Sequence, residues 1–474
     1  MMRRSIGALA LVLALVLAGC TVGYQPATEA PDRSPSPEGT HLGYYDGYWY
    51  NDTFEIDAED GLSPEQTEAV VSRAMARVQL LRGLRFDERV EVDIVSRETF
   101  RTEFDDVWSE PPADRRLLDN VQHEALFLVG PDEDVFDVRE NNRDGIVLGF
   151  YQPSRDRLVV VSGNDPATLD DEITLAHELL HALQDQRFGL AFDSPTLDSV
   201  NARNGLVEGD AVVVEREYER NCETGQWECV GVETAASPLP SEFHWGVYFV
   251  GFFPYAEGPA FVEHHRDRGG WEAVDRTYDD VPTASAEIIS PETYRSDTYG
   301  EAILEDRNDP AWERITVEDG ADAATVGQAG LASMFAYTAY AGDSPGVIDR
   351  DEFRTDGPDG PYSYDIEYAS GWYGDRLHAY ERNGETASVW NVTFNDRANA
   401  TTFAEGYDRV AAHWGGETRP PERGTLRTFD GDGPFRGAVW IEREDNAVTV
   451  VKAPNAAALG DVYAPAPDPV PASG

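Results

Sequence analysis

Three residues in one short stretch could act together chemically, since His177, Glu178 and His181 form an H-E-x-x-H pattern. Side chains four residues apart on an α-helix share a face, so the two histidines can bind one metal ion. Glu178 stands where a carboxylate can take a proton from a metal-activated water. A chain with nine histidines contains this pattern by chance with a probability of roughly 0.02. The pattern predicts a hydrolytic metal site; the alternative is two ordinary helix histidines beside a solvated glutamate.

The residues around the pattern predict that it lies on a helix. Thr168 can cap the helix N-terminus, and Asp170, Asp171 and Glu172 would complement the positive end of the helix dipole. Gly189 is placed to end the helix. The two histidines are therefore expected on one helix face.

A hydrolytic zinc ion takes three protein ligands and a water, so a third ligand is required. The pattern does not continue as in metzincins, because Gln184 and Arg187 stand where those enzymes have glycine and histidine. Glu208 follows His181 by 27 residues on a second predicted helix, and this spacing resembles that of gluzincin metallopeptidases. The resemblance implies one zinc ion bound by the two histidines and Glu208. Glu215, two turns further along the same face, is the alternative ligand.

The residues that would orient the ligands are less clearly indicated. Gluzincins often have an aspartate four residues after the ligand glutamate, and this chain has Val212 there. Asp210, Asp185 or a backbone carbonyl would then have to orient a histidine. Gly209 is expected to let the second helix approach the metal helix closely.

The aromatic segment 243–255 contains three residues that could stabilise an oxyanion, namely His244, Tyr248 and Tyr255. Such a segment is more often part of a core, so we prefer none of the three.

Two other histidine motifs are expected to bind no metal. His123 precedes a predicted strand over 124–129, and Phe127 stands where a second histidine would be needed. The pair His264 and His265 is expected to be solvated on an acidic helix.

The N-terminal residues predict export and membrane attachment. Residues 1–19 combine paired arginines, an apolar run and small residues, as in a signal peptide, and are short for a membrane span. The end of this segment, Leu-Ala-Gly-Cys, resembles the lipobox of exported lipoproteins, which implies a lipid on Cys20. An uncleaved anchor is the alternative, and the arginines match a twin-arginine signal only partly. Residues 20–42 are expected to be a disordered tether.

The composition indicates a salt-adapted surface protein. The net charge is −50, Lys452 is the only lysine, and such an acidic surface resembles that of haloarchaeal proteins. Nucleic acid is therefore excluded as a partner. Cys222 and Cys229 are predicted to form a disulfide outside the cell.

Three Asn-x-Thr sequences are weak indications of N-glycosylation at the surface, at Asn51, Asn391 and Asn399.

Hydrophobic patterns predict helices and strands along the rest of the chain. The expected elements are a helix capped by Ser63, a strand over 89–95, a hairpin of 145–151 with 157–161, paired strands over 377–380 and 387–394, a helix over 397–410, and a hairpin of 437–442 with 447–452.

Four sequence runs extend the resemblance beyond the histidine pattern: 174–186, 254–258, 269–271 and 371–376. They are similar to runs in a family of haloarchaeal surface lipoproteins related to gluzincin-like metallopeptidases. The resemblance implies an α+β, zincin-like fold, with a mixed sheet and the histidine helix followed by a helical half. We expect a metallopeptidase domain over 43–345, a C-terminal α+β subdomain over 346–452 and a disordered tail over 453–474.

These observations predict a zinc metallopeptidase, attached by a lipid to the extracellular face of the membrane, that hydrolyses peptide or protein substrates. Zinc would polarise the scissile carbonyl and activate water, and Glu178 would move the proton to the leaving amine. The alternative is a non-catalytic surface protein that keeps the zincin scaffold for binding or structure.

Overall fold

The computed structural model describes residues 41–54, 62–104, 110–169, 171–231, 239, 242–317, 321, 323–342, 345–355, 360–421, 423–431 and 433–466. The chain is α+β, as expected from the sequence. Its described residues form two compact units. Unit 1 is drawn from Met1–Phe104, Gly145–Leu190 and Val214–Pro240, and unit 2 from Asp105–Asp144, Ala191–Val213 and Ser241–Gly474. The consecutive domain limits expected from the sequence remain predictions, but the tail expected to be disordered over 453–474 contains a helix, Leu459–Val462, whose ends are buried in a core cluster.

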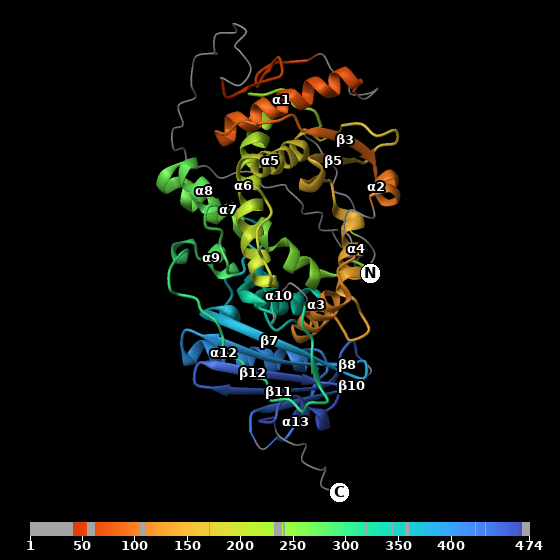
Figure 1. Ribbon diagram of the computed structural model, residues 1–474, viewed down its shortest axis with the longest axis vertical. Coiled ribbons are helices and arrows are strands. Elements are labelled where there is room, and N and C mark those ends of the chain that lie inside the picture. The colour runs from red at the N-terminus through yellow and green to blue at the C-terminus, as the bar shows by residue number, and fades with distance from the viewer. Residues whose placement is uncertain are drawn as a thin grey trace, which may run out of the picture. The chain divides into compact units, whose positions relative to one another are not determined.

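Unit 1 combines a small mixed sheet with helices (Figure 1). Its elements are β1 (Tyr44–Tyr45), β2 (Tyr48–Trp49), α1 (Pro64–Arg82), β3 (Glu91–Ser96), α2 (Arg97–Glu103), β4 (Gly149–Gln152), β5 (Arg157–Ser162), α5 (Glu172–Phe188) and the last part of α6 (Leu197–Glu223). β5 is the central strand, parallel to β3 and antiparallel to β4. The predicted hairpin and the strand predicted over 89–95 are confirmed.

The start of α1 follows from its sequence. The Ser63 hydroxyl accepts the backbone N–H of Gln66, and the Gln66 side chain accepts the N–H of Ser63. Pro64 occupies the first helical position, where its missing N–H costs nothing. The helix ends at Gly83, whose φ of 77° places it in the left-handed region.

A buried ion cluster joins α1, α5 and α6 within unit 1. The carboxylate of Glu172 lies 3.0 Å from Arg73 Nη2 and 2.7 Å from Arg77 Nη1, and all three side chains are buried. Tyr218 OH donates to the same carboxylate at 2.6 Å, and the N–H of Val230 donates at 2.8 Å. Two cations and two further donors satisfy this carboxylate, so the first turn of α5 is held firmly in place.

Unit 2 contains the remaining helices and a seven-stranded sheet. The helices are α3 (Ala113–Ala125), α4 (Val135–Ile146), the first part of α6, α7 (Trp245–Gly269), α8 (Trp271–Tyr278), α9 (Ser285–Ile289), α10 (Gly327–Tyr340), α11 (Arg350–Phe353), α12 (Arg397–His413) and α13 (Leu459–Val462). The strands are β6 (Glu313–Arg314), β7 (Trp372–Arg382), β8 (Glu385–Phe394), β9 (Glu417–Arg419), β10 (Thr425–Asp430), β11 (Arg436–Glu444) and β12 (Ala447–Ala453).

The strands of this sheet pair antiparallel in the order β6-β7-β8-β12-β11-β10-β9 (Figure 1). Both faces are covered. On β8, Val389 points to a cluster that includes Leu459 and Val462 of α13, whereas the next residue, Trp390, packs against Phe403 of α12. The alternation along β8 therefore buries apolar side chains on both faces. The hairpins and the helix predicted for this region are confirmed.

The strand predicted over 124–129 is wrong. Helix α3 continues to Ala125, and the chain then turns at Phe127, whose φ is 53°. The Phe127 ring packs against Tyr407, Phe429 and Phe435 at centroid distances of 5.6, 5.7 and 5.0 Å. This run is apolar because it is a buried turn, and not because it belongs to a sheet.

Lys452 of β12 is buried beside the same turn. Its Nζ lies 3.0 Å from Glu124 Oε1, donates to the Glu124 carbonyl at 2.8 Å and lies 5.0 Å from the centre of the Phe127 ring. Burial lowers the pKa of Lys452. The single lysine of the chain is thus part of the core of unit 2.

Among the described residues, no helix has the length and apolar character needed to cross a membrane. The predicted signal peptide and Cys20 lie in residues 1–40, outside the described residues.

Candidate metal centre

The H-E-x-x-H pattern lies on α5, as predicted. The helix is capped by Asp171, whose carboxylate accepts the N–H groups of Ile173 and Thr174 at 2.9 and 3.2 Å. The prediction that Thr168 is the cap is therefore wrong, because Asp171 is the residue directly before the helix. Gly189 ends the helix with a φ of 70°, as predicted.

The two histidines point their Nε2 atoms at each other, 3.1 Å apart. His177 Nδ1 lies 2.6 Å from Glu215 Oε2, and His181 Nδ1 lies 2.9 Å from Gln184 Oε1. An ionised carboxylate and an amide oxygen can only accept hydrogen bonds, so both Nδ1 atoms carry the proton. In the neutral form of each ring the Nε2 atom then carries a lone pair, and these two lone pairs face each other as two ligands of one cation would.

Glu208 completes a group with donor atoms suited to a metal. One nitrogen of each histidine and one oxygen of Glu208 all lie within 4.8 Å of one another. The His177 side chain is 12% exposed, and Glu208 is half-buried. Glu208 and Glu215 lie two turns apart on α6, so one helix face provides both the third donor and the hydrogen bond that orients His177.

Imidazole nitrogens and a carboxylate oxygen are donor types that zinc binds. Tetrahedral coordination with Zn–N distances of about 2.0–2.1 Å places two nitrogens about 3.3 Å apart, close to the 3.1 Å between the Nε2 atoms. Two imidazoles and one carboxylate leave a fourth position for water, as in hydrolytic zinc sites. His177, His181 and Glu208 could therefore hold a metal ion, as predicted.

Acidic residues on the last turns of α6 give this region a negative field. Burial raises the pKa of Glu219 to about 6, and Glu223, Glu215 and Asp171 raise it further. Burial is also the main cause of the raised pKa of Asp171, to which Glu215 adds. A cation near Glu215 would relieve this repulsion.

Glu178 lies between α5 and the sheet of unit 1. Its side chain is 8% exposed. A β-carbon on Gly149 of β4 would lie 2.9 Å from the Glu178 Cγ atom and 3.1 Å from the Val159 carbonyl oxygen. The backbone of β4 therefore packs directly against the carboxylate, and only glycine allows this approach.

The residues proposed from sequence to orient the histidines have other partners. Asp185 Oδ2 accepts the hydroxyl of Tyr151 at 3.0 Å, which links α5 to β4. Asp210 accepts the hydroxyl of Tyr278 at 2.9 Å in the core of unit 2. Glu215, expected as a surface group or alternative ligand, and Gln184, noted only against the metzincin pattern, hydrogen-bond the histidines instead. The spacing of Gln184 three residues after His181 could have suggested its role.

Gly209 does not serve the approach of α6 to α5 that was predicted for it. A β-carbon there would lie 2.3 Å from the backbone of Gly258 on α7, and one on Gly258 would lie 2.2 Å from the carbonyl oxygen of Gly205. These three glycines allow α6 and α7 to cross closely inside unit 2.

Among the oxyanion candidates, His244 caps α7, where its Nδ1 accepts the N–H of Val247 at 3.2 Å, and burial lowers its pKa. Tyr248 packs against Phe243 and Phe252 in an aromatic cluster of unit 2, and Tyr255 is 37% exposed. Their contacts give no reason to prefer one of them.

The disulfide between Cys222 and Cys229 is present, with Cα atoms 5.7 Å apart. Of the glycosylation candidates, Asn399 is partly buried in the first turn of α12, and Asn391 lies on β8 and donates to the Ile303 carbonyl at 2.9 Å. Asn51 lies in a turn and is partly exposed.

A family model described as a domain of unknown function, DUF8575, matches residues 313–463. The match begins at β6 and ends beside α13, so it covers the seven-stranded sheet and leaves out α5 and α6. No curated protein and no solved structure matches the chain. The candidate metal centre therefore has to be interpreted from its own geometry.

Proposed function

We propose that the protein is a zinc-dependent peptidase with a zincin-like fold, in which His177, His181 and Glu208 bind one zinc ion. The observation that carries the proposal is the pair of facing Nε2 atoms, 3.1 Å apart, while both Nδ1 atoms are engaged by oxygen acceptors. Two imidazoles with one carboxylate are typical zinc ligands, whereas calcium and magnesium prefer oxygen ligands alone.

In the proposed reaction, Glu178 moves the proton. Zinc bound at this site would lower the pKa of water towards neutrality and polarise the scissile carbonyl. Glu178 accepts a proton from the attacking water and donates it to the leaving amine. Glu215 and Gln184 hold the protons on the Nδ1 atoms of the histidines, so that the Nε2 atoms remain ligands.

Strand β4 supports a peptide as the substrate class. Among the described strands it pairs only with β5, and its Gly149 lies against Glu178. An extended peptide could add to the free edge of β4 by main-chain hydrogen bonds and lie beside the general base.

The location is part of the same proposal. We propose that the chain is an exported haloarchaeal lipoprotein, attached to the extracellular face of the membrane through a lipid on Cys20. The disulfide and the net charge of −50 agree with an oxidising, saline environment. Such a charge also disfavours nucleic acid as a partner.

The test is hydrolysis of a peptide library by the full chain, purified at high salt, beside Glu178→Gln. We expect the variant to bind about one zinc per chain, as the wild type does, and to lose at least a hundredfold in rate, since general acid–base catalysis contributes about 10²–10⁴-fold. Equal rates of hydrolysis by the wild type and Glu178→Gln would contradict the proposed mechanism. Zinc binding with no hydrolysis by either protein would instead favour a non-catalytic surface protein that keeps this scaffold.

A second variant probes the position of Glu178 without changing it. Gly149→Ala places a methyl group 2.9 Å from the Glu178 Cγ atom, so we expect zinc to be retained and hydrolysis to fall at least tenfold. Gly251→Ala, which adds the same group in open space, is the matched control. Equal rates for the two variants would show that the approach of β4 does not position Glu178.

A further inference from the structure

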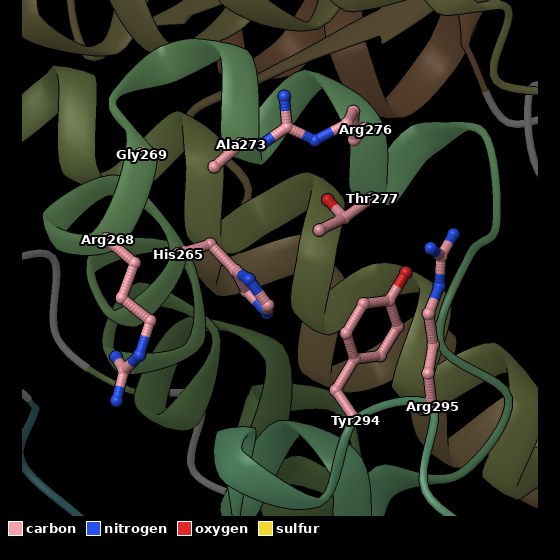
Figure 2. Close-up of a pocket in the computed structure, with 8 residues that line it drawn as sticks. All are labelled: His265, Arg268, Gly269, Ala273, Arg276, Thr277, Tyr294 and Arg295. Carbon is pink, nitrogen blue, oxygen red and sulfur yellow. The ribbon is translucent and has the colours of Figure 1, made fainter.

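A second site lies in unit 2, at the junction of α7 and α8. A cavity of about 240 Å³ is lined by His265, Arg268, Gly269, Ala273, Arg276, Thr277, Tyr294 and Arg295. Figure 2 shows His265, Thr277 and Tyr294 in the middle of this view, with Arg268 and Arg295 on opposite sides and Arg276 above them. The cavity is smaller than the roughly 300–1,000 Å³ of pockets for drug-sized ligands, so it suits a small ligand or one small chemical group.

The lining is cationic in a strongly anionic chain. None of the eight lining residues is acidic, three are arginines and one is a histidine, whereas the whole chain has 88 acidic and 38 basic residues. Positive charge that is concentrated in a concave site attracts anions.

Among the described residues, two of the three arginines, Arg268 and Arg276, form no ion pair with a carboxylate, whereas Arg295 does. Arg295 lies 2.8 Å from Asp280, but Arg268 donates only to the His264 carbonyl of its own helix, at 2.9 Å. In the part of the chain that the structure describes, Arg276 has neither an ion pair nor a hydrogen bond. Arg268 and Arg276 stand in the last turns of α7 and α8, where they also interact favourably with the negative helix ends, whereas Arg295 belongs to neither helix.

His265 provides a buried polar atom in the same cavity. Its ring lies 4.6 Å from Phe261 and 5.2 Å from Tyr294, between centroids. Its Nε2 atom is buried and has no hydrogen-bond partner among the described residues. Burial lowers its pKa to about 4, helped by the charges of His264, Arg268 and Arg295. A neutral imidazole can still donate one N–H to a ligand.

We propose that this cavity binds a tetrahedral oxyanion, namely a phosphate or sulfate group. Guanidinium groups recognise such anions through several charge-assisted hydrogen bonds. Arg276 and Arg295 come from separate segments, and their guanidinium groups together offer more donors than the two oxygens of a carboxylate can accept, whereas a tetrahedral group has oxygens facing several directions. The site uses no residue of the candidate metal centre.

The experiment is equilibrium dialysis of the full chain against radiolabelled inorganic phosphate, with the ionic strength held constant by potassium chloride. The His177→Ala background removes phosphate binding at the candidate metal centre. We expect one saturable site per chain, and at least a tenfold loss of affinity in Arg276→Gln, a change that breaks no ion pair among the described residues.

Arg307→Gln is the control, because Arg307 is 50% exposed, pairs with Glu305 and lies outside the cavity. The proposal is overturned if phosphate and sulfate show no saturable binding, or if Arg276→Gln and Arg307→Gln bind equally well. Competition by glycerol phosphate would assign the site to a phosphate group carried by a larger molecule, and failure to compete would assign it to the free anion.

Discussion

The chain contains the dipeptide His-Glu twice on helices, and the two copies have opposite surroundings. On α5, His177 and His181 direct their Nε2 atoms towards each other, 3.1 Å apart. On α3, His123 is fully buried, its Nδ1 lies 2.8 Å from the Asp119 carbonyl oxygen, and its Nε2 lies 3.2 Å from Arg139 Nη2. On α5 the two Nε2 atoms face each other beside the Glu208 carboxylate, whereas on α3 both nitrogens of His123 contact a carbonyl and an arginine. The dipeptide alone does not distinguish a site from a core residue.

The glutamates differ in the same way. Glu178 packs against the glycine backbone of β4, whereas Glu124 lies 3.0 Å from the ammonium of the buried Lys452. We therefore expect changes at α5 to alter metal binding and catalysis, and changes at α3 to alter stability.

The largest expected difference is in metal content. His177→Ala removes a ligand, so we expect bound zinc to fall from about one per chain to almost none, because two remaining donors hold zinc poorly. His123→Gln should keep its zinc. Elemental analysis of the full chain after dialysis measures both. Equal zinc content in the two variants would place the metal elsewhere.

The next effect concerns stability. Glu124→Gln leaves the Lys452 ammonium buried without its carboxylate, which should reduce the free energy of unfolding by about 3 kcal/mol. Glu444→Gln, a change at an exposed position on β11, should shift it by less than about 0.5 kcal/mol. Denaturant unfolding at constant salt compares the two. A shift below about 1 kcal/mol for Glu124→Gln would mean that the core accepts an uncharged lysine at this position.

A smaller effect is expected where the two helices of the candidate site meet. Glu215→Gln weakens the hydrogen bond that orients His177, so zinc affinity should fall about 10–100-fold. Glu223→Gln, an exposed change on the same helix, should leave it unchanged. Competition with a zinc chelator gives both affinities. A complete loss of zinc in Glu215→Gln would make Glu215 a ligand and not an orienting residue.

The smallest effect is a pH dependence at α3. Burial, and next the charge of Arg139, lower the pKa of His123 to about 3, while the unfolded chain has the ordinary value of about 6.5. The unfolded state therefore binds the proton first, and this contribution to stability is complete above about pH 6.5 and is lost as the pH falls towards 3. We expect His123→Gln to reduce the slope of unfolding free energy against pH by about 1 kcal/mol per unit between pH 6 and 4. Identical slopes for wild type and variant would contradict the lowered pKa.

Short-range patterns were sufficient to predict much of this molecule. The capping box at Ser63, the hairpin before α5, and the group of His177, His181 and Glu208 all depend on fixed spacings along the chain. A helix or a turn determines where residues of a given spacing lie relative to one another, so these features can be predicted from the sequence.

Features that depend on tertiary packing were missed. The oxygen of Glu215 reaches His177 because of side-chain geometry that no spacing rule specifies, and Gly209 packs on Gly258, 49 residues away in the sequence. The apolar run after Glu124 favours a strand by its composition, but a buried turn and a buried strand have similar composition. The arginines of the oxyanion cavity are also distributed over separate segments, and only folding brings them together.

The buried position of Lys452 gives the protein a built-in reporter of unfolding. An amine-reactive reagent would find no other lysine side chain in the sequence, and it cannot reach this one while β12 and α3 remain packed, because the residue is 4% exposed. The rate at which a lysine label appears would therefore follow the opening of the unit 2 core. Mass spectrometry of a single peptide could then record how this opening responds to salt.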